Sequence, residues 1–168
     1  MMRYASLVAV VALSACGGGS DGSATAPQTE SGPSSARADY IARADAFCTD
    51  AASNPELSQS LEQLENTPQS DPNFRALAED HFRLVLEIAE RARTGFMEIE
   101  PPEADRPAIT ELNAANDRAI ERLRDVISAL EGSGDPTPEV NSYAQVIAAA
   151  GRLADAYGFE VCAGAGGS

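Results

Sequence analysis

Most of the chain alternates apolar and polar residues with the three-to-four-residue period of an amphipathic α-helix. The first predicted helix begins near Ala38 and ends at the break formed by residues 53–55, which end in a proline. A short second segment, 55–64, is predicted to continue as helix before a loop at 66–68. The apolar positions of the first helix are Tyr40, Ile41, Ala44, Phe47, Cys48 and Ala51.

A longer apolar stripe predicts a helix that starts at 70–72 and runs to about Phe96. Asp71 suits the capping position and Pro72 suits the first helical position. We expect Gly95 and the proline pair at 101–102 to end this helix, in an acidic loop over 98–105. The stripe consists of Phe74, Ala78, Phe82, Val85, Ala89 and Phe96, widened by Leu77, Leu84 and Ile88.

Two further helices complete the predicted fold. One follows 105–107, ends at the glycines of 132–134, and has a seam typical of a coiled coil. The other starts at 137–139 and ends at Gly158, a suitable C-terminal cap. The seam of the first consists of Ile109, Leu112, Asn116, Ala119, Leu123, Val126 and Leu130, and that of the second of Val140, Tyr143, Ile147, Ala150, Ala154 and Tyr157.

This pattern predicts an all-α fold. No stretch alternates as a strand would, and the polar connections between the helices are short. We therefore expect an antiparallel bundle of about four helices over residues 38–163.

A different pattern occupies the start of the chain. Arg3 precedes an apolar run, 4–13, that is too short to cross a bilayer, and small residues then lead to Cys16. Residues 13–16 read Leu-Ser-Ala-Cys, which is a lipobox. We predict a lipoprotein signal peptide over 1–15 and acylation of Cys16, for example with palmitate. The alternative is an ordinary secretory leader with a chance cysteine at its end.

The segments at either end of the predicted bundle lack a helical pattern. Residues 16–37 are rich in Gly, Ser and Pro and contain no aliphatic side chain larger than alanine, so we predict a flexible tether that carries the lipid at Cys16. Residues 164–168 are predicted to be a disordered tail. The chain is thus expected to be held by its lipid at the outer face of the cell membrane.

Charge narrows the range of partners. Cleavage before Cys16 leaves 153 of the 168 residues, removes Arg3, and moves the net charge from −14 to −15. Such acidity excludes nucleic acid as an expected partner. All 12 basic residues are arginines, a composition typical of high-GC genomes and thus of an actinobacterial source.

Two cysteines remain once Cys16 is acylated. Cys48 lies on the apolar face of the first helix and Cys162 just beyond the last. An even pair in an oxidising compartment favours a disulfide. Two buried free thiols, or a metal held by the pair, are the alternatives, although no further soft ligands lie near either cysteine in the sequence.

Three short motifs resemble a group of small exported or lipid-anchored actinobacterial helical proteins. They are residues 39–48 (DYIARADAFC), residues 99–102 (IEPP) and residues 156–162 (AYGFEVC). In that group a Tyr-Ile segment ending in cysteine opens the domain, and a Tyr-Gly segment ending in cysteine closes it. The resemblance implies an all-helical domain and a Cys48–Cys162 disulfide. It implies no activity.

Few residues suggest chemistry. His81 is the single histidine of the chain. The sequence therefore lacks the residues that usually form a catalytic triad, a di-metal site in a helical bundle or a haem attachment site. We interpret His81 as a structural residue. Asn116 interrupts an apolar seam; it either fixes the helix register or anchors a ligand. We predict no enzyme, and no catalytic, cofactor-binding or metal-binding residue.

These features favour a non-catalytic interaction module that is anchored in the membrane and binds an envelope protein, a ligand or itself. The alternative is an envelope lipoprotein that binds a solute or a cation. For a cation the acidic loop 98–105 is the candidate, although its two prolines do not fit a calcium loop.

Overall fold

The computed structural model describes residues 34–164. The predictions for the signal peptide, Cys16, the tether up to residue 33 and the tail from residue 165 lie outside this range. Within it the chain is all-α and has no strand. The elements are α1 (Ser35–Ala52), α2 (Pro55–Asn66), α3 (Phe74–Glu98), the 3-10 turn η1 (Glu103–Asp105), α4 (Arg106–Glu131), α5 (Thr137–Tyr157) and α6 (Val161–Gly164).

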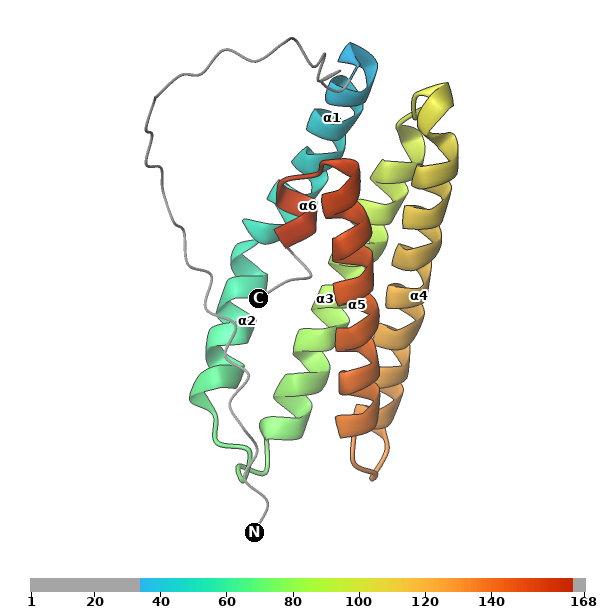
Figure 1. The fold of residues 1–168 in the computed structure, drawn as a ribbon. Coiled ribbons are helices and arrows are strands. Elements are labelled where there is room, and N and C mark those ends of the chain that lie inside the picture. Colours follow the sequence, from blue (N-terminus) through green and yellow to red (C-terminus); the bar gives the residue numbers. More distant parts are fainter. Residues whose placement is uncertain (1–33, 165–168) are drawn as a thin grey trace, which may run out of the picture. The chain divides into compact units, whose positions relative to one another are not determined.

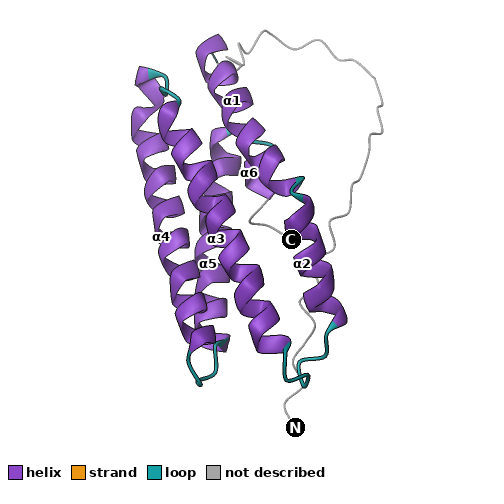
Figure 2. Cartoon of the chain, turned by 180° about the vertical axis from the view of Figure 1, so that it is seen from behind, coloured by secondary structure: helices purple, strands orange, loops and turns teal. Residues whose placement is uncertain are grey.

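The helices form an antiparallel bundle, as predicted. α1 and α2 follow one another along one side and together make the first long member, after which α3, α4 and α5 alternate in direction (Figure 1). The same order is seen from behind (Figure 2). α2 packs on α3, α3 on α4, and α4 on α5, while the short α6 packs on both α1 and α5.

α4 supplies half of the buried apolar side chains, because α3 and α5 both pack against it. Nine of its side chains are buried, including all six apolar members of the predicted seam. Around one end of the bundle Tyr40, Phe96 and Phe159 pack with Ile109 and Leu112. Towards the other end Ala78 of α3 packs against the α4 side chains of Val126 and Leu130. The apolar positions of the predicted coiled-coil-like seam are therefore confirmed as core positions.

Two helix starts differ from the prediction. α1 begins at Ser35, inside the segment predicted as tether, because the Ser34 hydroxyl caps it by accepting a hydrogen bond from the Arg37 amide (3.3 Å). α3 begins only at Phe74. The Asp71 carboxylate accepts from the Asn73 amide (2.8 Å) and stabilises a turn before the helix, so the prediction that Asp71 caps the helix is wrong.

The prediction that Gly95 ends α3 is also wrong, because α3 continues to Glu98. Gly95 is buried, and a Cβ atom there would overlap the Phe47 ring of α1. The glycine is required for the close approach of α1 and α3, so its role is in packing rather than termination. Gly158, in contrast, caps α5 as predicted, with φ of 107° and its N–H donating to the carbonyls of Ala154 and Asp155.

Within residues 34–164, no helix combines the length and the apolar character that crossing a membrane requires.

Candidate functional site

A disulfide joins the two ends of the described domain. The Sγ atoms of Cys48 in α1 and Cys162 in α6 are 2.07 Å apart, and the Cα atoms are 5.3 Å apart. This separation falls within the usual range for disulfides of roughly 4.4–6.8 Å. The predicted pairing is confirmed.

The sequence did not reveal how Cys162 is held in place. The Asp45 carboxylate of α1 accepts hydrogen bonds from the backbone amides of Glu160 (3.0 Å), Val161 (3.2 Å) and Cys162 (3.0 Å). These are the amides at the start of α6, which have no partner within their own helix. In the sequence Asp45 is one of 26 acidic residues, and no local signal links it to amides more than a hundred residues away.

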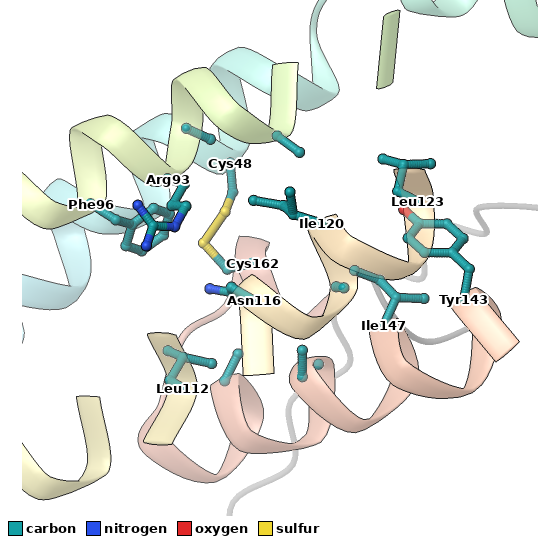
Figure 3. A pocket seen from close by; sticks show the side chains of 16 residues that line it. Cys48, Arg93, Phe96, Leu112, Asn116, Ile120, Leu123, Tyr143, Ile147 and Cys162 are labelled. Carbon is teal, nitrogen blue, oxygen red and sulfur yellow. A yellow bond between two sulfur atoms is a disulfide. The ribbon is translucent and has the colours of Figure 1, made fainter. Parts of the chain in front are cut away.

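Beside the disulfide lies an apolar cavity of about 190 Å³. Helices α3, α4 and α5 form most of its wall, and the disulfide closes part of it (Figure 3). The lining comprises Cys48 and Cys162, Ala89, Ala92, Arg93 and Phe96 of α3, Leu112, Asn116, Ala119, Ile120 and Leu123 of α4, and Tyr143, Ile147, Ala150, Gly151 and Ala154 of α5. Several wall positions are alanine or glycine, and these short side chains leave the space between the helices unfilled.

Three polar side chains line this cavity. The Arg93 guanidinium is paired with the carboxylate of Asp117, to which Nη2 donates over 3.1 Å. Burial raises the pKa of the Tyr143 hydroxyl, so this group is neutral at physiological pH. Asn116, the polar member of the predicted seam, is half-buried at the wall. The structure thus brings Asn116 and the cysteine pair, three residues singled out from the sequence, to one site.

The side chains of the lining are mostly apolar. They include no carboxylate, no histidine and no hydroxyl nucleophile activated by a base. The lining therefore suits the binding of an apolar molecule.

His81 lies outside this cavity. Its Nδ1 atom is 2.9 Å from the Ser60 hydroxyl of α2, and burial lowers the pKa of the imidazole. The same hydroxyl also donates to the backbone carbonyl of Leu57 (2.9 Å). The contact between Ser60 and His81 links α2 to α3.

The acidic loop has a structural role through its last residue. Asp105 is 6% exposed, and its carboxylate accepts from the Arg37 guanidinium (Nε, 2.9 Å) and from the Tyr157 hydroxyl (3.0 Å). Arg37 also stacks over the Tyr157 ring, 5.0 Å from its centroid. Over residues 34–164, no three histidine, cysteine or acidic side chains gather closely enough to hold a metal ion. Asp105, the last residue of the loop, therefore joins α1 to α5.

We expect Asp105→Asn to lower the melting temperature near neutral pH. The hydrogen bond from Arg37, followed by that from Tyr157, holds the pKa of Asp105 below its usual value, so the carboxylate stabilises the fold at any pH above the unfolded pKa near 4. This contribution is lost as the pH falls through the lower, folded pKa. Thermal melts across pH 2–8 should therefore show a difference in melting temperature between variant and wild type that is largest at neutral pH and becomes smaller in acid. Asp155→Asn, an exposed change on α5, is the control and should have little effect.

Comparison with protein-family models found no match, and searches of curated proteins and of solved structures also found none. The resemblance to exported actinobacterial proteins therefore remains a prediction that rests on its three motifs.

Proposed function

We propose that this protein is a lipid-anchored, extracytoplasmic binding protein that acts without catalysis and holds a small solute in the cavity beside its disulfide. The proposed location at the membrane is supported by the signal peptide and the lipobox that ends at Cys16. The activity is supported by one observation above all, the apolar cavity of about 190 Å³ among α3, α4 and α5.

The size of the cavity favours a small solute over a protein partner. An engineered protein cavity of about 150 Å³ lined by Leu, Ile and Phe binds benzene. The cavity described here is of similar size and mostly apolar, so its volume suits a molecule of six or seven non-hydrogen atoms that contains a ring. Of the binding hypotheses raised by the sequence, solute binding gains most from this geometry, and cation binding gains least.

The proposed membrane location is tested by the substitution Cys16→Ala. We expect the wild-type protein to fractionate with membranes and to begin at an acylated Cys16, whereas the variant remains unprocessed or leaves the membrane fraction. Ser20→Ala is the matched control and should fractionate like wild type. Mass spectrometry that found an unmodified N-terminus downstream of Cys16 would contradict the proposed anchor.

Binding is tested with toluene and the lipid-free mature chain, residues 16–168 carrying Cys16→Ser. Toluene at ten times its dissociation constant should raise the melting temperature by about 3–5 °C, because it binds only the folded state. Ala150→Leu places a larger side chain in the cavity wall and should abolish this shift. Ala92→Leu, on the opposing helix α3, serves as a second filled variant.

The control for filling the cavity is Ala156→Leu, the same change at an exposed position of α5. It should leave the toluene shift as in wild type. A shift of equal size in wild type and in both filled variants would show that toluene binds elsewhere, and the proposed binding site would then be wrong.

A further inference from the structure

The polar groups of the cavity indicate what kind of solute it accepts. Asn116 projects from α4 into a wall that is otherwise mostly aliphatic and aromatic, next to Cys162 in the view of Figure 3. Among the hydrogen bonds of residues 34–164, none involves the Asn116 side-chain amide. Its neighbour on the same helix, Asn113, differs, since its amide contacts the Met97 sulfur at 3.7 Å and it does not line the cavity.

The Asn116 side chain is half-buried, so its amide can bond to water, and an apolar molecule that covered it would leave the amide without a partner. Polar groups removed from water lose free energy when they lack a hydrogen-bond partner, so nearly all of them have one. A leucine would continue the seam at this position and would pack at least as well. A molecule in the cavity that carries a hydrogen-bonding group avoids this loss, because it bonds to the amide in place of water.

The charge around the cavity restricts that molecule further. Arg93 is the one basic side chain in the lining, and its guanidinium already donates to both carboxylate oxygens of Asp117. An anionic ligand would have to compete with Asp117 for this arginine. No acidic side chain lines the cavity, so a cationic ligand finds no counter-charge either. The environment therefore suits a neutral molecule.

We propose that the cavity accepts a small neutral molecule with an apolar, ring-sized body and one hydroxyl group, which hydrogen-bonds the Asn116 amide. This inference rests on the proposed solute-binding function and specifies its ligand class. Asn116 acts as the specificity-determining residue, because its amide can both donate to and accept from a hydroxyl. The aliphatic walls contribute affinity for the ring and do not distinguish a hydroxyl from a methyl group.

The test compares phenol with toluene, which have the same number of non-hydrogen atoms and differ by a hydroxyl in place of a methyl. Dissociation constants are measured by calorimetric titration of the lipid-free mature chain. In Asn116→Leu the dissociation constant of phenol divided by that of toluene should rise roughly tenfold, because phenol loses one hydrogen bond in a desolvated site. Toluene should bind this variant at least as well as wild type.

Asn113→Leu is the matched control, the same change on the same helix outside the cavity, and should leave the ratio unchanged. Tyr143→Phe should also leave it unchanged, because the hydroxyl is assigned to Asn116. If Asn116→Leu does not fold, Asn116→Ala gives the same comparison in a slightly larger cavity. Benzoate should bind at least tenfold more weakly than phenol, because it lacks a free counter-charge.

Three results would overturn the assignment while leaving solute binding intact: a ratio unchanged in both Asn116 variants, a ratio that changes in Tyr143→Phe instead, or benzoate binding as tightly as phenol. If neither phenol nor toluene binds the wild-type protein, the proposed function and this inference both fail.

Discussion

Reduction of the Cys48–Cys162 disulfide is expected to lower the free energy of unfolding by about 4–5 kcal/mol. The two cysteines are 114 residues apart in the sequence, so the bond closes a long loop in the unfolded chain and removes much of its entropy. The melting temperature of the lipid-free mature chain should fall by roughly 10–15 °C. Its helical circular dichroism at 20 °C should change little, because the helices also pack on one another: α1 and α2 on α3, α3 on α4, α4 on α5, and α5 on α6.

The control is Cys48→Ser combined with Cys162→Ser. This variant should melt near the temperature of the reduced wild type, and adding a reductant should not lower it further. Thiol titration of the native wild-type chain should find no reactive thiol before reduction. Two titratable thiols in the protein exported from its own host would contradict the account of the disulfide.

Leu123→Ala is expected to lower the free energy of unfolding by about 3–4 kcal/mol. Leu123 is 1% exposed, one of the two most deeply buried large side chains of the domain, and lies in the middle of α4. Truncation removes its buried methyl groups and leaves a hole that neighbouring helices cannot close without moving. Urea unfolding followed by circular dichroism measures this change. The m value, which is the slope of the free energy of unfolding against urea concentration, should stay the same.

Leu61→Ala provides the comparison, because Leu61 is 43% exposed on α2. The same truncation there should change the free energy of unfolding by less than about 1 kcal/mol. Leu123 also lines the cavity, so its truncation enlarges the space and should admit a bulkier ring than wild type accepts. Equal effects of the two substitutions would show that α4 is not the centre of the core.

The fold was largely predictable from the sequence because burial follows the helical period. The seam of α4 and the ends marked by Gly158 and by Gly132 were read correctly, since these depend on neighbouring residues in the sequence. Gly95 was misread because a glycine that permits two helices to touch looks the same, in sequence, as one that ends a helix. Asp71 was misread because a side chain that stabilises a turn resembles one that caps a helix.

The candidate site was only partly predictable. Asn116 and the cysteine pair stood out as exceptions to a local pattern. The cavity did not, because it results from short side chains on three helices that face one another only after folding. Asp45 and Asp105 were equally hidden among many acidic residues, since their partners, the amides of α6 and the guanidinium of Arg37, come from distant parts of the chain.

The most direct test of the central claim is to identify what the protein carries in its own membrane. The wild-type protein and Ala150→Leu are each released from the membranes of their host, purified gently, and extracted with organic solvent for mass spectrometry. We predict a small neutral hydroxyl-bearing compound in near-stoichiometric amount from wild type, and little or none from the filled variant. Equal amounts of the same compounds from both proteins, or no compound from either, would contradict a solute-binding cavity.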